Sequence, residues 1–429
     1  KRLIDIVGCI IGGANGGGNK ELMALVNRWG GAKDATVLIH GCKAPAANAA
    51  LLNSLMARSF DFGVITPYIG ERPVWAHIAE TNVPEAITVA EWKKASGKDM
   101  LTALILGDDT TTRVAAASTR SISPGWDTPG TVDKFGSVAI AAKLMGLNEY
   151  QIIQAWGIVL NQLAGSFQPI HDARHAFKLA QGLAARDGVV AAEMAATGWT
   201  SARDPLQGRY GYFALYCKEN DPSWITHDLG KAFYGDGTFK PYPGCRFVHS
   251  TIDCGLDLVR NNEFNAEDIV SANINTAPMH YDSPLNQPWE IGDFPQANGI
   301  FSLRYQLASV LVRKNVKIEY LTEPFIRDAA AGALARKITV TGDVPPEQIE
   351  RSEVTVKMKD GRTMHTEVEC ARGNALKKPL SKDDIITKFR DNVAFSKTIS
   401  KTASEKVLDI LNHIEEVKDV SALVKLLLA

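Results

Sequence analysis

The chain has 429 residues, 45% of them hydrophobic and 22% charged, and its 47 Lys and Arg residues against 48 Asp and Glu residues give a net charge of −1. These proportions exclude a disordered chain and a fibrous repeat. At about 150 residues per domain, the length suggests two or three domains. The balanced charge argues against a nucleic-acid or membrane-surface binder. No apolar run reaches the roughly 20 residues that a membrane span needs.

The cysteines are scattered, at positions 9, 42, 217, 245, 254 and 370. They form no CxxC motif and no Cys/His cluster with zinc spacing, so we expect no metal site of that kind. A long chain with scattered cysteines is typical of a reducing compartment, and we expect a cytoplasmic protein. The sequence begins at Lys1, in mid-pattern and without Met, so we expect some N-terminal sequence to be missing.

The first two hundred residues predict a succession of helices. Pro45 opens a segment that is rich in Ala and Leu and has no β-branched residue, which favours a helix. Gly146 and Gly198 follow apolar runs where a helix C-cap is expected, and Asn148 and Gln151 have capping-box spacing. The predicted helices cover residues 1–12, 45–60, 84–95, 99–119, 131–145, 149–165 and 176–198.

The pattern changes near residue 236. A loop punctuated by Gly and Pro, GDGTFKPYPGCRF, precedes alternating segments at 269–276 and 337–341, and Asp360-Gly361 between two alternating runs predicts a hairpin. Helical patterns lie at 299–314, 322–335, from Ser381 onward and at 403–428. We therefore predict a mainly α protein with a large helical domain, residues 1–238 and 376–429, and a smaller α+β lid domain, residues 239–375.

Two motifs suggest chemistry but lack an essential part. The glycine cluster at 12–20 has the glycine spacing of a phosphate loop, but Asn19 replaces its Lys and no hydroxyl follows, so we interpret it as a loop between helices. His171 and His175 are four residues apart but lack the HExxH glutamate and an evident third ligand. We expect no metal there; with Lys178, this cationic helix start can instead hold substrate carboxylates or form a solvated turn.

Two other segments combine residues suited to a carboxylate substrate. Asp61 closes an apolar helix and His77 precedes the next one, so the two can share a pocket, or be a helix cap and a surface histidine. Lys240, Arg246 and His249 lie in the Pro-rich loop at the predicted domain junction, where ligand clefts tend to form. Lys and Arg there suit a di- or tricarboxylate. A serine hydrolase is not indicated, because no GxSxG motif is present.

These loops belong to a pattern that runs almost from end to end. The matching pieces include LIDIVGCIIGG, RSFDF, GWDTPGTVDKFGSVAIAAKLMGL, FKLAQGLAARDGVVAAEMAATG, FKPYPGCRFVHSTID, GIFSLRYQLA and PLSKDDIITKF. The chain thereby resembles the MmgE/PrpD family, which contains 2-methylcitrate dehydratase, cis-aconitate decarboxylase and iminodisuccinate epimerase. The resemblance implies a large helical domain completed by C-terminal helices and a smaller α+β lid. It also implies a cofactor-independent enzyme, usually a homodimer, that removes a proton beside a carboxylate of a small polycarboxylate.

The resemblance also implies pocket residues. Asp61 matches the first Asp of a DFDD-like motif, and His77 matches the His that opens the next helix. Lys178 matches the Lys before the small-residue helix, Lys240 matches the first Lys of the KPYP loop, and Tyr281 in MHYDSP matches a pocket Tyr.

Three positions depart from the family's decarboxylase. Asp127 and Cys245 stand where that enzyme has His, and Ile65 replaces a Thr, since the DFDD motif reads DFGV here. These changes remove two imidazoles and a hydroxyl, and they argue against cis-aconitate decarboxylase in particular. A 2-methylcitrate dehydratase-like hydro-lyase, another hydro-lyase or an epimerase stays open.

Our hypothesis is a lyase in which His77 is the general acid or base and Asp61 orients it. Tyr281 would protonate a leaving hydroxyl, and Asp127 is a second base if burial raises its pKa. The cationic residues Lys178, Lys240 and Arg246, with His249 beside them, would bind the substrate. An epimerase, with Asp127 facing His77, and a non-catalytic carboxylate-binding protein are the alternatives.

Overall fold

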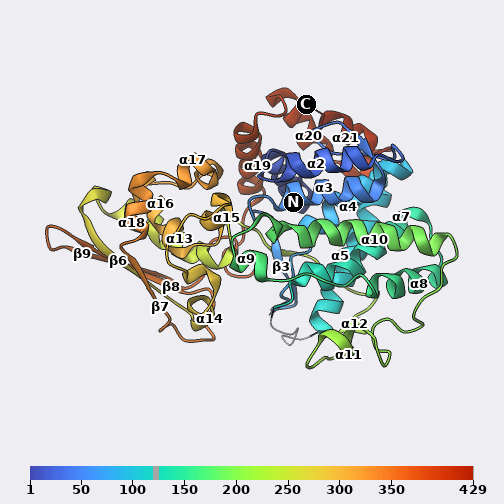
Figure 1. Cartoon of the computed structure of the whole chain (residues 1–429), viewed down its shortest axis with the longest axis horizontal. Helices are drawn as coiled ribbons and strands as arrows, with labels where there is room; N and C mark the ends of the chain where they lie inside the picture. The colour runs from blue at the N-terminus through green and yellow to red at the C-terminus, as the bar shows by residue number, and fades with distance from the viewer. Residues whose placement is uncertain (119–124, 429) are drawn as a thin grey trace.

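The computed structural model describes residues 1–118 and 125–428, and helices make up most of it. Figure 1 shows a larger helical lobe and a smaller lobe that contains a four-stranded sheet. This confirms the prediction of a mainly α protein with some β structure. The domain boundaries at 238/239 and 375/376 stay a prediction. Among the described residues, no helix combines the length and the apolar character needed to cross a bilayer.

The larger lobe is built on helices that approach one another closely through small residues. At Gly182 of α10, an added Cβ would lie 2.9 Å from side-chain atoms of Leu51 and Leu55 on α3. At Gly188 it would lie 1.9 Å from the Ser137 hydroxyl on α7. The helices are α1 (Arg2–Gly13), α2 (Asn19–Trp29), α3 (Ala46–Arg58), α4 (Ala79–Lys93), α5 (Gly97–Ala117), α6 (Thr128–Thr131), α7 (Asp133–Met145), α8 (Glu149–Leu160), α9 (Gln168–His171), α10 (Leu179–Ala196), α11 (Tyr212–Tyr216) and α12 (Ser223–Thr226).

The predicted helices of this lobe are present, but two boundaries differ by five residues. One is the end of the helix expected at 149–165, which stops at Leu160. Asn148 and Gln151 form the expected capping box, and Gly146 ends α7 with a φ of 73°. The helix expected at 84–95 begins five residues earlier and contains Pro84. Residue 119, the end of another predicted helix, lies outside the described residues.

The smaller lobe carries a sheet of strand order β7-β6-β8-β9, in which β6 and β7 are parallel and the other pairs antiparallel. The predicted Asp360-Gly361 hairpin joins β8 to β9, with Gly361 at a φ of 88°. The strands are β6 (Ile269–Thr276), β7 (Ile338–Thr341), β8 (Ser352–Met358) and β9 (Thr363–Val368). The helices are α13 (His249–Asn261), α14 (Pro278–Tyr281), α15 (Pro295–Ile300), α16 (Leu303–Arg313), α17 (Glu323–Ile326) and α18 (Ala329–Ala335).

Two predicted helices of this lobe are each divided by a cap. The Ser302 hydroxyl accepts a hydrogen bond from the Tyr305 backbone N–H at 3.1 Å and starts α16, which separates it from α15. The Asp328 carboxylate accepts from the Ala331 N–H at 2.9 Å and starts α18 after α17. Ser and Asp are strong N-caps, so each starts a new helix within an otherwise continuous helical pattern.

The sequence did not predict the short strands that lie before residue 239. β3 (Ile65–Ile69) pairs with β4 (Arg72–Pro73) and with β5 (Gly237–Thr238), with Ile65 opposite Thr238. The pairing brings the chain just after residue 61 beside the chain just before residue 240. A further pair is β1 (Ala35–Thr36) with β2 (Lys43–Ala44).

The C-terminal helices α19 (Lys382–Ser396), α20 (Lys401–Asn412) and α21 (Ser421–Leu426) return to the larger lobe, beside α1 to α3 in Figure 1. Lys388 on α19 is buried and forms an ion pair with Asp5 of α1, Nζ to Oδ1 at 2.7 Å. Its ammonium also donates to the carbonyls of Phe62 and Lys240. One cation of the last helices thus fixes the two loops that contain Asp61 and Lys240.

We predict that Lys388→Met destabilises the protein by about 3–5 kcal/mol, because it leaves the Asp5 carboxylate buried without a partner. Urea unfolding measures the change. Lys382→Met, at the exposed start of the same helix, should stay within about 0.5 kcal/mol of the wild type. Equal losses in the two variants would contradict a structural role for the pair.

Candidate active site

Asp61 lies one turn beyond α3 in an unusual backbone conformation. Its φ is 47°, in the left-handed region that non-glycine residues rarely adopt, and its side chain is 1% exposed. Such conformations persist where the surroundings impose them, and they concentrate at functional sites. The loop therefore sends a carboxylate inward at a fixed place.

Two buried cations meet at this carboxylate. Arg58 Nη1, from the last turn of α3, and Lys240 Nζ, from the loop after β5, both donate to Asp61 Oδ1. Lys240 Nζ also donates to the Asp61 carbonyl at 2.9 Å. Burial alone would raise the pKa of Asp61, but the two cations together hold it well below its usual range. Asp61 is thus a permanent anion at neutral pH and a poor proton acceptor.

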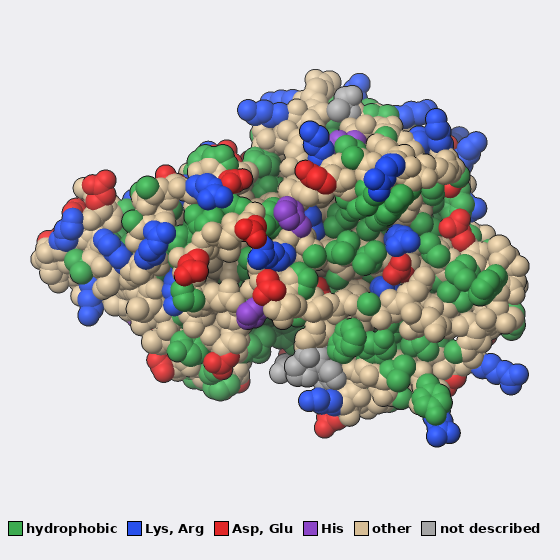
Figure 2. Space-filling model, viewed as in Figure 1, with side chains coloured by type: hydrophobic (Ala, Val, Ile, Leu, Met, Phe, Trp, Pro, Cys, Tyr) green, Lys and Arg blue, Asp and Glu red, His purple; other side chains and the backbone are tan. Residues whose placement is uncertain are grey.

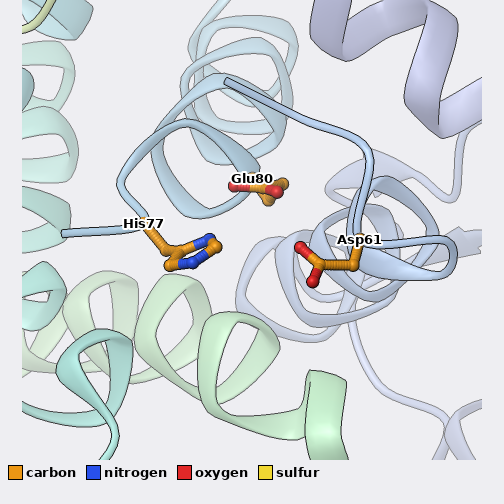
Figure 3. Close-up of side chains that lie close together, drawn as sticks. All are labelled: Asp61, His77 and Glu80. Atoms are coloured by element: carbon orange, nitrogen blue, oxygen red, sulfur yellow. The ribbon is translucent and has the colours of Figure 1, made fainter. Parts of the chain in front are cut away.

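His77 lies beside Asp61 and Arg58. Figure 3 shows its ring and the Asp61 carboxylate directed toward each other. His77 Nδ1 lies 3.4 Å from Arg58 Nη1, and because a guanidinium can only donate, we assign the ring proton to Nε2. Burial, Arg58 and Lys240 hold the pKa of His77 well below its usual value. The imidazole is therefore neutral at pH 7, and His77 as a whole residue is partly exposed.

Asp127 is another acid whose charge interacts with Arg58. It is 6% exposed and precedes α6, and burial raises its pKa to about 6, an effect that Asp61 increases and Arg58 opposes. The sequence analysis made Asp127 a second base on the condition that burial raises its pKa, and this condition is met. Cys245, near Asp61, Lys240 and Arg58, has a pKa that burial raises to about 11 and is a neutral thiol.

Lys178 belongs to a separate polar cluster that includes Ser59, the residue after Arg58. Its Nζ lies 2.6 Å from the Gly17 carbonyl, 2.7 Å from Asn19 Oδ1 and 3.3 Å from Ser59 Oγ. The glycine cluster is the predicted loop between α1 and α2, and it supplies acceptors to this lysine. Burial lowers the pKa of Lys178 to about 7, and the acid that opposes this is Glu21. Lys178 thus joins the glycine loop to Ser59, the residue after Arg58.

Arg246 forms its ion pair and its hydrogen bonds within the smaller lobe. Its guanidinium contacts Glu350, Nη2 to Oε2 at 2.9 Å, and donates to the carbonyls of Ala371 and Arg372 at 3.0 and 2.6 Å. His249 is fully buried at the start of α13, and burial, with Arg246 and Lys240, keeps its pKa well below the usual value. Arg246 also lines a cavity of about 450 Å³ between the lobes, where it can meet a ligand.

Tyr281 lies farther out, on α14. It is 43% exposed and packs beside Gly342. None of the contacts within the described part of the chain joins it to Asp61 or His77. Its neighbour His280 is buried against Phe247, with ring centroids 4.5 Å apart, and burial lowers the pKa of His280 to about 4.

Asp61, His77 and Glu80 offer donor atoms that all lie within 4.8 Å of one another, as a metal site requires. The chemistry of the surroundings does not fit a cation, because Arg58 and Lys240 already occupy the Asp61 carboxylate. A divalent ion would have to displace two fixed positive charges. The set fits an anionic ligand better. The histidine pair at 171 and 175 does not converge, since His171 contacts Asp172 and His175 stacks on Phe294.

Comparison with known proteins identifies the family of this chain. Models of the MmgE/PrpD N-terminal and C-terminal domains match residues 1–225 and 242–413. The chain belongs to the MmgE/PrpD family. Cis-aconitate decarboxylase of Homo sapiens is 25% identical over 409 residues, which cover 89% of this chain and 79% of that protein. The enzyme of that name from Aspergillus terreus is 24% identical over 420 residues, 91% of this chain and 83% of its own.

Sequence reasoning missed two charged residues of this MmgE/PrpD site, Arg58 and Glu80. Both are fully enclosed, and Arg58 Nη1 lies 3.8 Å from Glu80 Oε1. Each is a charged residue within an Ala-rich helix segment, three residues from Asp61 or His77. Asp61 and His77 lie just outside the ends of these helices, so nearness in the sequence was the available signal.

We predict that Asp61→Asn destabilises the protein by about 3–5 kcal/mol at neutral pH, because Arg58 and Lys240 lose their shared anion. Asp61 has a lowered pKa, so its stabilising effect is complete above about pH 4 and disappears as the pH falls toward the folded-state pKa. Chemical unfolding from pH 7 down to pH 3 measures this. The exposed Asp409→Asn is the control; a wild-type advantage over Asp61→Asn that does not shrink in acid would contradict the assignment.

Proposed function

We propose that this protein is a cofactor-independent lyase, a hydro-lyase similar to 2-methylcitrate dehydratase, that acts on a small di- or tricarboxylate. The observation that supports this most directly is the pair of buried cations, Arg58 and Lys240, beside the neutral imidazole of His77. Cations in an enclosed site attract carboxylates and stabilise the charge that develops when a neighbouring C–H bond is broken.

The proposed reaction begins with loss of the proton next to the substrate carboxylate. The C–H electron pair moves into an enolate-like carboxylate, which Arg58 and Lys240 stabilise. Neutral His77 accepts the proton, or Asp127 does so above its pKa of about 6. The C–O bond then breaks, and the leaving hydroxyl takes up a proton and departs as water. A low His77 pKa makes the imidazolium a good donor for this step; Tyr281 is the other candidate donor if the lobes close.

An epimerase is the second candidate, and one observation favours it. Asp127 and His77 both interact with Arg58, so two groups able to carry a proton flank the same guanidinium. Inversion at carbon needs an acid and a base on opposite faces. A non-catalytic carboxylate-binding protein would use the same cations. Decarboxylation, named for the relatives, is less favoured because Asp127, Cys245 and Ile65 replace the two His and the Thr of that enzyme.

We also propose a homodimer in the cytoplasm. The dimer rests on the family resemblance. The six cysteines are free thiols, which suits a reducing compartment.

Proton NMR in D₂O with citrate, 2-methylcitrate, cis-aconitate, malate, tartrate and aspartate-like diacids tests the function. Deuterium incorporation with loss of water would support the hydro-lyase, and loss of CO₂ would overturn it in favour of a decarboxylase. Exchange with inversion and no loss would establish the epimerase. Ligand-induced thermal stabilisation without any exchange would establish a binding protein.

We predict that His77→Ala lowers turnover by roughly a hundredfold or more while the protein stays folded, because the imidazole carries the proton. Steady-state rates with the substrate identified by NMR measure the loss, and circular dichroism checks the fold. His365→Ala, on the exposed face of β9, is the matched control. Near-normal turnover of His77→Ala would remove His77 from the mechanism.

A further inference from the structure

Glu80 has no assigned role in the mechanism above, yet it is the least solvated acid of the site. Its side chain is 0% exposed, and neither carboxylate oxygen has a hydrogen-bond donor within the described residues. The nearest cation is Arg58, at 3.8 Å, a distance at which the charges interact without a hydrogen bond. A buried acid in this state is costly unless it carries a proton or serves a function.

The fold holds Glu80 in this position by two local arrangements. Pro84 has no N–H, so the Glu80 carbonyl four residues earlier receives no helical hydrogen bond; instead, the Ser54 hydroxyl of α3 donates to it at 2.6 Å. At Gly63, an added Cβ would lie 2.7 Å from Glu80 Cδ and Oε1. The space beside Gly63 is therefore filled by the Glu80 carboxyl group. Figure 3 shows that group above the gap between His77 and Asp61.

We propose that Glu80 is a functional member of this site, the group that takes up one proton when a polycarboxylate binds, and that Gly63 makes room for its carboxyl group. This inference rests on the proposed function, since it takes the ligand to be a di- or tricarboxylate. It adds a residue and a proton-coupled binding step.

The charges around Glu80 support this step. The titratable and charged groups that face it are Arg58 on α3, Asp61 and His77 in the loops that flank β3 and β4, Lys240 after β5, Cys9 on α1 and Asp133 on α7. Burial keeps the pKa values of Asp133 and Cys9 well above their usual ranges and that of His77 well below, so all three are neutral.

The remaining charged neighbours are two cations and one anion. With Glu80 ionised, the group has no net charge; with Glu80 protonated, it has a charge of +1. Burial raises the pKa of Glu80 to about 7, so both states are populated near neutral pH. A di- or tricarboxylate brings two or three negative charges to the same cations, which favours the protonated state. One proton from solvent therefore adds to the Glu80 carboxylate as the ligand binds.

The test uses propane-1,2,3-tricarboxylate, an unreactive tricarboxylate whose own groups are ionised above about pH 7. We expect its affinity for the wild type to fall about tenfold per pH unit above pH 7, since one proton is taken up on binding. Calorimetry in buffers of different ionisation enthalpy should show that uptake directly. Glu80→Gln, a neutral mimic of the protonated acid, should lose both effects and bind at pH 8 about as tightly as the wild type does below pH 7.

Glu85→Gln is the matched control. Glu85 lies on the same helix and is also fully buried. Burial raises its pKa well above the usual value, a hydrogen bond with Ser137 opposes this, and no neighbouring cation contributes. It should keep the wild-type pH dependence. A Glu80→Gln variant that keeps this dependence, or an Asp127→Asn variant that loses it instead, would overturn the proposal. Failure of the wild type to bind this tricarboxylate or citrate at any pH would overturn the polycarboxylate function and the proposal together.

Gly63→Ala provides a second test that does not remove the acid. The new methyl group must displace the Glu80 carboxyl and the end of the Ile6 side chain, which would lie 2.8 Å from it. The φ of Gly63 does not require glycine, so the effect is local. In Gly63→Ala, we expect the pH range over which tricarboxylate affinity falls to shift by one unit or more from that of the wild type. When Gly63→Ala is added to Glu80→Gln, we expect no shift relative to Glu80→Gln alone. Equal shifts in both backgrounds would show that Gly63 acts independently of Glu80.

Discussion

The site depends on the burial of one carboxylate between two cations. Asp61 is reached by Arg58 from α3 and by Lys240 from a loop almost 180 residues later, and none of the three has appreciable contact with solvent. Burying charges is unfavourable unless each finds partners, so the chain must bring these segments together completely. The pairing of β3 with β5 does part of this, and Lys388 does the rest by holding the Phe62 and Lys240 carbonyls from behind.

This constraint determines which groups can transfer protons. The two cations keep Asp61 ionised and His77 neutral, while the acids that lie farther from the cations, Glu80 and Asp127, have pKa values raised by burial to about 7 and 6. An arrangement that separates the proton affinities of neighbouring groups is typical of acid–base catalysts. It also places positive charge where a carboxylate ligand would bind. The same burial therefore accounts for the anion preference and for the available proton carriers.

The sequence predicted what depends on local pattern. The helices, the capping box at Asn148 and the hairpin at Asp360-Gly361 follow from spacing and turn chemistry, and the structure contains them. Asp61 and His77 were named as partners, and the structure brings them together. The partners of a side chain come from distant parts of the sequence, so the local pattern does not predict them. Lys178 binds the glycine loop and Arg246 binds Glu350, although both were expected to face the substrate. The short strands β3 and β5 form by pairing with each other, and neither was predicted from its own sequence pattern.

The start of α4 shows how one such misjudged boundary bears on function. Pro favours the first turn of a helix, so the sequence placed the helix start at Pro84. The helix begins instead at Ala79, because the carbonyl that Pro84 leaves without a donor is satisfied by Ser54 of α3. The five additional residues form the turn that directs Glu80 toward Arg58 and follows directly from His77. A tertiary hydrogen bond thus extends a helix to the place where its first turn adds an acid to the site.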